Sequence, residues 1–230
     1  MNQSISPISS FYNNYSFRVS ELSLFQFCPK RSYITIFNKD SLEYEKYTSK
    51  NKYMVKGTQM HQSYSSWSRS FDRLKVLYDL KYNVPLPYVR NLDNIQIRGI
   101  FDDIRIIRDT RSNEKYVSFI ELKTTHRKRL WSNEINSGVF QLQLYLWILR
   151  PYLEKLNYKL HTRHYLEIYS QVTNKLLKRI IVTEDKDIED RIRDIVKVFL
   201  KEKAMSYPQK YICKRCPKVI RSKCSYGSSK

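Results

Sequence analysis

The chain of 230 residues is long enough for one domain with a real core, or for one domain with a small appendage. Its 42 Lys and Arg against 22 Asp and Glu give a formal charge of +20, which indicates a polyanionic partner and not merely a basic surface. Nucleic acid is favoured over a membrane because the basic residues are spread along the chain, and no stretch approaches the roughly 18 apolar residues of a bilayer span or forms a signal-peptide core.

The first segment leads to a cysteine. Residues 1–19 are rich in Ser, Asn and Tyr and are expected to form a loose arm. Ser20 is typical of a helix N-cap, which predicts a short helix over 21–27. Cys28 is therefore expected directly after a helix.

The middle of the chain combines helical and strand patterns. Apolar residues at helical spacing predict a helix over 56–80, which would carry His61. The run 95–107 alternates as in a β-strand, but the phase of the alternation changes between Gly99 and Asp103. This change predicts a bulge or a sharp bend.

A second strand and an apolar helix follow. The strand 116–123 is apolar on both faces until Glu121 and Lys123, which the two-residue period of a strand places on one face. The next segment, 139–149, is strongly apolar and is predicted to be helical.

The C-terminal third begins after Pro151 with two predicted strands, 163–170 and 175–182, which form a hairpin. Apolar residues at helical spacing then predict an amphipathic helix over 188–200. The tail, 201–230, is basic and carries three of the four cysteines.

Acidic residues on the two central strands indicate a metal site. Hydrolysis of a phosphodiester needs an activated water and a neutralised transition state, and divalent cations supply both. Asp102 follows the predicted bend and Glu121 lies on the next strand, so both can reach one cation, with Lys123 beside them. The alternative is an exposed Glu–Lys ion pair, but the apolar flanks of the strand argue against a solvated position. Spacing alone does not separate Asp102 from Asp103.

Three further polar residues accompany this group. His61 on its predicted helix could be a metal ligand, although a lone histidine is more often structural. Gln141 and Tyr145 are four residues apart and therefore lie on one side of a helix. A contact with substrate and a packed helix rim fit this pair about equally well.

Four cysteines form a second constellation. Cys213, Cys216 and Cys224 have the spacing C-x2-C-x7-C, and Cys28 lies far upstream. Four thiolates suit either Zn²⁺ or an iron-sulfur cluster, and disulfides are the weaker interpretation for a chain without a signal core. Either metal would hold the two ends of the chain together.

In this order, the motifs resemble the RecB-like nucleases of the PD-(D/E)xK superfamily that carry an iron-sulfur cluster. Within that group the sequence is similar to the CRISPR-associated nuclease that trims DNA for spacer acquisition, and to exonuclease V. The resemblance spans most of the chain, from the segment ending in Cys28-Pro29 to Cys224. One departure is the last cysteine gap of seven residues, where the family more often has about five.

The resemblance implies roles for the central residues. His61, Asp102 and Glu121 resemble the metal ligands of the family, which favours Asp102 over Asp103. Lys123 matches the catalytic lysine of the family. A site with one nitrogen and two carboxylate ligands suits Mn²⁺ at least as well as Mg²⁺.

The resemblance also covers the remaining motifs. Gln141 and Tyr145 match a family motif that packs beside the active site and contacts DNA. Four cysteines would bind a [4Fe-4S] cluster, with Zn²⁺ as the alternative: Cys28, Cys213, Cys216 and Cys224.

The expected fold is α/β, with a restriction-endonuclease-like mixed sheet flanked by helices. A cysteine-ligated cluster cap would join the N- and C-terminal segments. The expected divisions are a loose N-terminal arm (1–19), a RecB-like nuclease domain (20–200) that contributes Cys28 to the cluster, and a cluster-binding C-terminal segment (201–230).

The expected activity is that of a metal-dependent exonuclease on DNA, preferring single-stranded ends and acting in CRISPR spacer acquisition, an antiviral defence. The alternatives are a repair or viral exonuclease of the same family and a scaffold that binds DNA without cleaving it. The expected partners are DNA and the CRISPR integrase complex, and the expected location is the cytoplasm. A homo-oligomer is a further candidate.

Overall fold

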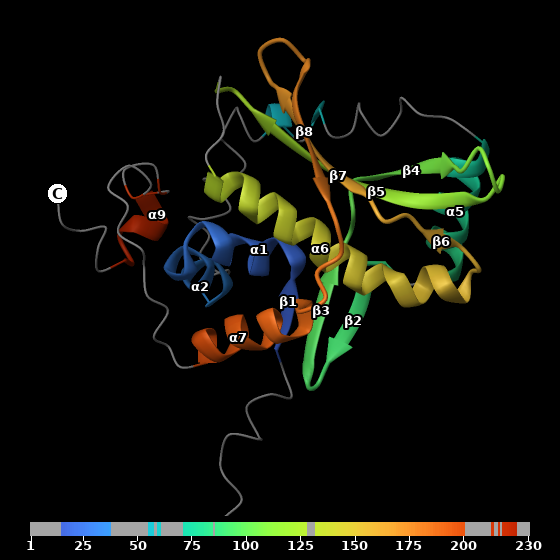
Figure 1. The fold of residues 1–230 in the computed structure, drawn as a ribbon. Coiled ribbons are helices and arrows are strands. Elements are labelled where there is room, and N and C mark those ends of the chain that lie inside the picture. Colours follow the sequence, from blue (N-terminus) through green and yellow to red (C-terminus); the bar gives the residue numbers. More distant parts are fainter. Residues whose placement is uncertain are drawn as a thin grey trace, which may run out of the picture.

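The computed structural model describes residues 15–37, 55–57, 59–60, 71–84, 86–127, 132–200, 213, 216 and 218–224. Over these residues the fold is mixed α/β, with two sheets and flanking helices (Figure 1). None of the helices in these ranges is long and apolar enough to cross a bilayer.

The smaller sheet has three strands in the order β1-β3-β2. These are β1 (Ser16–Arg18), β2 (Tyr88–Leu92) and β3 (Ile95–Gly99). β1 pairs with β3 in parallel, and β2 and β3 form an antiparallel hairpin. Neither β1 nor β2 is among the strands that the sequence predicts.

The larger sheet has the order β4-β5-β7-β8, and β6 pairs with β5 outside this path. Its strands are β4 (Asp103–Arg108), β5 (Lys115–Thr125), β6 (Lys159–Leu160), β7 (His164–Ser170) and β8 (Leu176–Val182). β5 and β7 are parallel, whereas β4 with β5 and β7 with β8 are antiparallel. The sheet is therefore mixed, as predicted.

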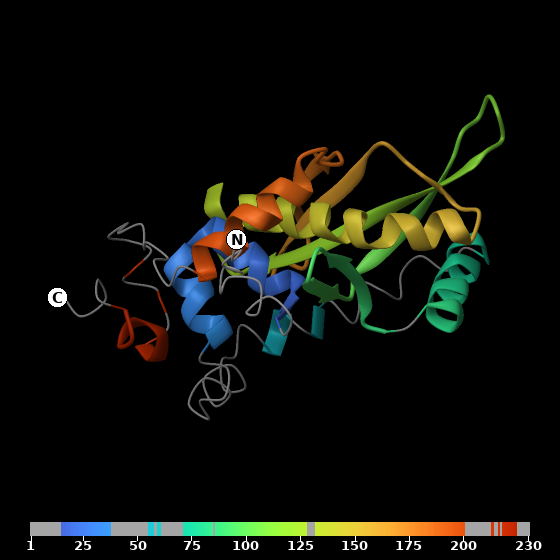
Figure 2. The same ribbon diagram turned by 90° about the horizontal axis from the view of Figure 1, so that it is seen from below.

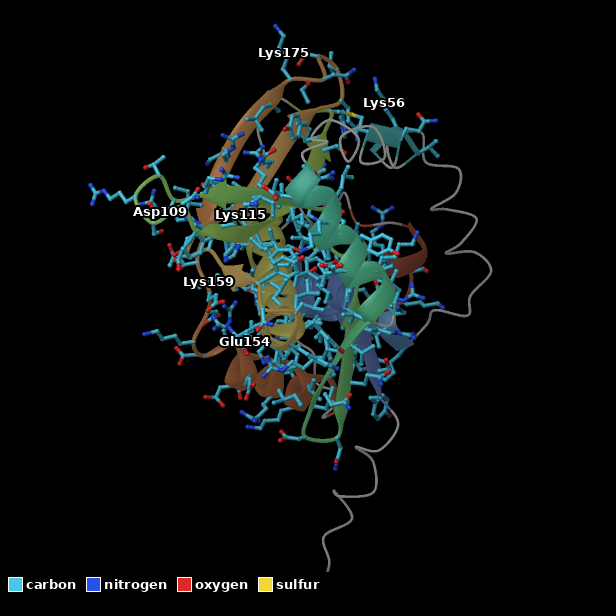
Figure 3. All side chains as sticks on the ribbon, turned by 90° about the vertical axis from the view of Figure 1, so that its right-hand side faces the viewer. Lys56, Asp109, Lys115, Glu154, Lys159 and Lys175 are labelled. Atoms are coloured by element: carbon cyan, nitrogen blue, oxygen red, sulfur yellow. The ribbon has the colours of Figure 1, made fainter. Side chains whose placement is uncertain are left out.

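The turn that joins β4 to β5, residues 109–114, projects from the sheet (Figure 3), and Asp109 lies at its base, where its backbone N–H donates to the carbonyl of Glu114 at 2.8 Å. The Asp109 carboxylate accepts the backbone N–H of Arg111 at 2.8 Å. Asn113 adopts a left-handed φ of 56°. The turn is thus ordered by its own residues.

One long helix, α6 (Ser132–Lys155), runs along the larger sheet and contacts β5, β7 and the smaller sheet (Figures 1 and 2). At the C-terminal end of α6 lies α5 (Phe71–Asn83), which contacts β4.

At the other end of α6 lie α1 (Val19–Phe27), α2 (Pro29–Phe37) and α7 (Ile188–Leu200). α1 packs on both α6 and α2, and the short α9 (Lys218–Arg221) contacts α2. The main core lies between these helices and the two sheets, and its largest fully buried side chains are Phe17, Phe119, Phe140 and Phe199.

Helix α6 is much longer than the predicted helix 139–149: it begins at Ser132, before the predicted start, and continues through Pro151 to Lys155. Proline has no N–H to donate to the carbonyl four residues earlier, which belongs to Trp147. That carbonyl instead accepts a hydrogen bond from Arg90 Nη1 at 2.5 Å. A side chain from β2 thereby satisfies the acceptor that the proline leaves unpaired.

The start of α1 also differs from the prediction. The helix begins at Val19, so Ser20 lies inside it and is not the N-cap. The first-turn acid Glu21 accepts the backbone N–H of Arg18 at 2.8 Å, which satisfies a donor at the helix start. Cys28 follows α1 as predicted, but a second helix, α2, begins at the very next residue.

The other predicted elements have three outcomes. The break in the run 95–107 is confirmed, since residues 100–102 separate β3 from β4, which belong to different sheets. The hairpin β7–β8 and the helix α7 are confirmed as well. For the helix predicted over 56–80, residues 56–57, 59–60 and 71–80 are helical, and residues 61–70 lie outside the described ranges.

Candidate active site

Strand β5 carries the two charged residues at the centre of the site. Glu121 and Lys123 lie on one face of the strand, where the Lys123 ammonium donates a hydrogen bond to Glu121. Lys123 Nζ also donates to Gln141 Oε1 of α6 at 2.9 Å. Glu121 and Lys123 therefore face α6, and the even-numbered residues of β5 face the other way.

Asp102 is held next to β5 by the main chain. It lies in the break between β3 and β4, and its Oδ2 accepts the backbone N–H of Leu122 at 2.7 Å. Leu122 stands between Glu121 and Lys123 in the sequence. The bend predicted before Asp102 thus brings this carboxylate to the central pair.

Asp103 points away from this group. It pairs in register with Ile120, on the face of the sheet opposite to α6. Its carboxylate is buried and bound to Arg73 of α5, with Arg73 Nε 3.0 Å from Oδ1. Burial raises the pKa of Asp103, and the Arg73 guanidinium opposes that shift. The structure therefore places Asp102, and not Asp103, beside Glu121.

Glu121 occupies an environment that penalises its charge. It is 1% exposed, and burial, reinforced by the adjacent Asp102, raises its pKa to about 8. Among the described residues, its Oε2 is buried without a hydrogen-bond partner. A buried carboxylate oxygen without a donor is costly, and a cation placed between Asp102 and Glu121 would remove the cost. These donors fit a hard divalent cation such as Mg²⁺ or Mn²⁺.

Lys123 stays protonated in this setting. Burial alone would lower its pKa, but attraction by Glu121 and Asp102 and the hydrogen bond to Glu121 raise it overall. The site therefore holds a permanent positive charge beside two carboxylates.

Gln141 and Tyr145 complete the α6 side of the site. Gln141 Nε2 donates to the Tyr145 hydroxyl at 3.2 Å, while its Oε1 accepts from Lys123. Tyr145 is buried, and its burial raises the pKa of the phenol well above the usual range. A chain of hydrogen bonds thus runs from Tyr145 through Gln141 to Lys123.

Two glycines let neighbouring elements approach the site. A methyl group on Gly99 would lie 2.6 Å from a ring carbon of Tyr145 and 2.8 Å from Val19. A methyl group on Gly57 would lie 2.9 Å from the Thr124 hydroxyl of β5. Close approach of neighbouring elements therefore gives each glycine a physical reason.

His61, the expected nitrogen ligand, lies outside the described residues. Its neighbour Met60 is buried against Ile120 and Leu122, the residues on either side of Glu121 in β5. Within the described ranges, no three or more His, Cys, Asp or Glu side chains are arranged to hold a metal ion. The described residues therefore bring together two carboxyl groups, those of Asp102 and Glu121.

Basic residues surround the end of the sheet beyond the site. Lys175 lies at the tip of the β7–β8 hairpin, and Lys56 lies at the same end of the molecule (Figure 3). Gln171 of this hairpin donates its backbone N–H to the carbonyl of Thr125, the last residue of β5. The hairpin is thereby fixed to the strand that carries Glu121.

The four cysteines are free thiols, and Cys28 is buried at the junction of α1 and α2. Burial raises the pKa of Cys216 to about 11; Arg31 opposes this shift, and Cys28, Cys224 and Cys213 add to it. The other three thiols are therefore close enough to Cys216 to influence its charge, although the four cysteines do not form a metal site in the described residues.

Sequence reasoning missed Arg73 and the buried Glu167 of β7, which is 1% exposed and bound by two arginines. Arg73 lies in a predicted helix but carries no motif. Glu167 lies in a predicted strand and is one of many charged residues. Only their long-range partners distinguish them, so no local signal in the sequence could have found them.

Two comparisons with known proteins find matches, one with a family model and one with solved structures. The family model described as the PD-(D/E)XK nuclease superfamily matches residues 39–221. Among solved structures, the crystal structure of SSO0001 is similar with a TM-score of 0.55 over 96% of this chain and 97% of that chain. At 17% identity this likeness shows the fold alone. No curated protein matches the chain. Since the family model covers well over half of the sequence, the chain belongs to the PD-(D/E)XK nuclease superfamily.

Proposed function

We propose that the protein is a metal-dependent exonuclease that hydrolyses phosphodiester bonds in DNA. Nucleases of this superfamily typically use Mg²⁺ or Mn²⁺. The observation that carries the proposal is the buried Glu121 oxygen without a hydrogen-bond donor, beside Asp102 and the Lys123 ammonium. Two carboxylates and one amine converge in a place that is otherwise unfavourable for a charge.

Asp102 and Glu121, with His61, would hold the divalent cation. When bound, the cation supplies an acidified water and neutralises charge on the phosphate. Lys123 places a fixed positive charge where negative charge develops in the transition state. Gln141 orients the Lys123 ammonium, and Tyr145 orients Gln141, so the amine is held before substrate binds.

The proposed substrate is single-stranded DNA, degraded from an end. The charge of +20 supports binding to a polyanion. The proposed pathway is CRISPR spacer acquisition, with the integrase complex as a partner, and it rests on the family resemblance of the motifs. A repair or viral exonuclease of the same family is the alternative pathway.

A scaffold without activity is the rival from another class. Such a protein has no need for a Glu121 buried beside Asp102 and a lysine, since burying an ionisable group costs stability. The presence of Asp102, Glu121 and Lys123 together in one site therefore favours an enzyme.

The proposed role of the four cysteines is to bind a [4Fe-4S] cluster, with Zn²⁺ as the alternative. Support comes from Cys216, whose thiol is influenced by those of Cys28, Cys213 and Cys224, so that thiols from both ends of the chain lie in one region. A cluster of this kind also fits a cytoplasmic location, where thiols stay reduced. Iron and sulfide analysis of anaerobically purified protein tests this; one zinc and no iron would refute the cluster.

The nuclease proposal is tested by degradation of end-labelled single-stranded DNA with Mn²⁺. We expect Asp102→Ala and Lys123→Ala each to lower the rate by at least about a hundredfold. Lys115→Ala is the matched control, since Lys115 lies on the same strand but is exposed and remote from Glu121. Equal activity of the wild type and both site variants would end the proposal.

A further inference from the structure

The face of the larger sheet opposite to α6 carries a buried charge that the proposed chemistry does not use. Glu167 of β7 is 1% exposed, and it pairs in register with Leu122 of β5 and Arg179 of β8. Because Glu121 faces α6, Leu122 and its partners face the other way. Glu167 is thus one strand away from the active site, on the reverse side of the sheet.

Two arginines and a tyrosine surround this carboxylate. Arg105 Nη2 of β4 and Arg179 Nε of β8 both donate to Glu167 Oε1 at 2.8 Å. The Tyr169 hydroxyl donates to Oε2 at 2.8 Å. Both guanidinium groups lie over the ring of Tyr165, at 5.9 and 5.7 Å from its centroid. One carboxylate holds two guanidiniums, so the group keeps a net charge of +1.

Both arginines retain hydrogen-bond donors that have no acceptor within the described part of the chain. Each guanidinium has five N–H groups, and the described residues take one from each, at Glu167. The side chains of Arg105 and Arg179 are 38% and 43% exposed. Their positions are fixed by a shared acceptor and a shared ring, so the remaining donors are preorganised for an oxyanion.

The surroundings favour the phosphate of a polynucleotide over a free anion. Ile181 of β8 pairs in register with Tyr165 and is 55% exposed, so an apolar and aromatic surface adjoins the two arginines. A sugar or base next to a bound phosphate would cover this surface, whereas inorganic phosphate would leave it exposed.

We propose that Arg105 and Arg179 bind a backbone phosphate of nucleic acid outside the active site, on the sheet face opposite to α6. The proposal rests on the proposed function, since the DNA bound here is the DNA being degraded. If the arginines served only to neutralise Glu167, their removal would change stability and leave the electrostatics of DNA binding unchanged.

The test is a titration of fluorescently labelled DNA by anisotropy, with EDTA present and salt varied from about 50 to about 200 mM. We expect Arg179→Gln to bind about tenfold more weakly, with a salt slope smaller by about one. Lys178→Gln is the matched control, because Lys178 is exposed on the same strand but faces the other side. Equal losses in the two variants would overturn the proposal.

A second variant, Glu167→Gln, is expected to change DNA affinity in the direction opposite to Arg179→Gln. Glu167→Gln keeps the shape and can still accept from both arginines, but it raises the charge of the group by one. We expect it to bind DNA at least as tightly as the wild type. A loss comparable to that of Arg179→Gln would contradict the phosphate site. Should Arg179→Gln not fold, Arg179→Lys keeps the ion pair but loses the planar fork, and we expect about threefold weaker binding.

Two controls separate the sources of failure. Millimolar inorganic phosphate, at matched ionic strength, should leave DNA binding unchanged; a phosphate-specific loss that Arg179→Gln abolishes would assign the site to the free anion. With Mn²⁺ and saturating DNA, Arg179→Gln is expected to keep kcat within about twofold of the wild type, while its KM rises with the weaker binding. If no variant cleaves DNA, the proposed function fails, while the EDTA titrations still decide the phosphate site.

Discussion

Glu121 and Lys123 stand two residues apart, and both have a raised pKa for different reasons. Burial and Asp102 raise the pKa of Glu121 to about 8, while attraction to both carboxylates raises that of Lys123. In the metal-free protein at neutral pH, Glu121 therefore holds a proton and Lys123 holds its charge. A divalent cation must displace that proton before it can bind.

This competition makes metal affinity depend on pH. The pKa of Glu121 is about 8 in the folded protein against 4.5 ordinarily, so between these values the folded state holds a proton that the unfolded state has lost. Stability of the metal-free protein should fall as pH rises through this window, and Mn²⁺ affinity should rise. We expect calorimetry near pH 7.5, where a histidine ligand is ordinarily already neutral, to show release of close to one proton on Mn²⁺ binding. Glu121→Gln should release none; proton release that persists in this variant would contradict the assignment.

Gln141 should affect catalysis more than binding, because it touches Lys123 and not the metal ligands. We expect Gln141→Ala to lower kcat by about tenfold to a hundredfold, with little change in DNA affinity. Gln143→Ala is the control, since Gln143 lies two residues further along α6 and contacts Thr183 and Arg191 instead. Equal effects of the two substitutions on kcat would remove Gln141 from the site.

At this scale the sequence predicts a good part of the candidate site. The two-residue period of a strand places Glu121 with Lys123, and the four-residue spacing places Gln141 with Tyr145. The preference for Asp102 over Asp103 has another origin in the structure: Leu122 donates its amide to Asp102, and Arg73 binds Asp103. Both contacts join residues at least 20 positions apart in the sequence, so short-range spacing cannot predict them.

At the scale of elements, the close approach of β3 to α6 depends on Gly99. A methyl group there would collide with Tyr145 of α6 and with Val19 of α1, both buried. Neither neighbour can move without disturbing the core that holds Gln141 in place. Gly99 is thus a packing requirement, and its φ is not left-handed.

We expect Gly99→Ala to destabilise the protein by about 1–3 kcal/mol and to lower activity by displacing Tyr145. Gly138→Ala is the comparison, since its methyl group would meet only the side-chain ends of Leu166 and alanine favours the helix by up to about 1 kcal/mol. Urea unfolding of both variants measures the difference. A larger loss in Gly138→Ala would contradict this account of the packing.

Elements with a strong period are predicted well, and those that depend on distant partners are not. The amphipathic pattern of 188–200 matches α7 throughout. The end of α6 was misplaced because proline normally stops a helix, and only Arg90, far away in the sequence, satisfies the Trp147 carbonyl. Strand β1 has only three residues and pairs with β3, about 80 positions away in the sequence. It is therefore too short to show the alternation of apolar and polar residues that predicts a strand.

At the scale of the whole molecule, the cysteines link segments that are far apart in the sequence. Cys28 lies between α1 and α2, and α9, flanked by Cys216 and Cys224, contacts α2. A metal cluster across these thiols would close almost the whole chain into one loop, and loop closure stabilises the folded state.

Loss of the cluster should therefore lower the melting temperature. We expect Cys28→Ser to lower it by about 4–8 °C, which corresponds to roughly 2 kcal/mol for a chain of this size. The double variant Cys28→Ser/Cys224→Ser should have the same melting temperature as Cys28→Ser, because one missing ligand already releases the cluster. Additive losses measured by calorimetry would show two independent packing effects in place of a shared site.

Strand β5 has the proposed catalytic group on one face and the arginine pair on the other, whereas the turn at 109–114 projects from the sheet (Figure 3). Deleting one residue within β5 would exchange its two faces and abolish both sites. The projecting turn is instead a suitable attachment site, because a dye or a biotin linker bound there leaves both faces of β5 open. Single-molecule recordings of strand degradation could then be made with the enzyme anchored to glass by this turn.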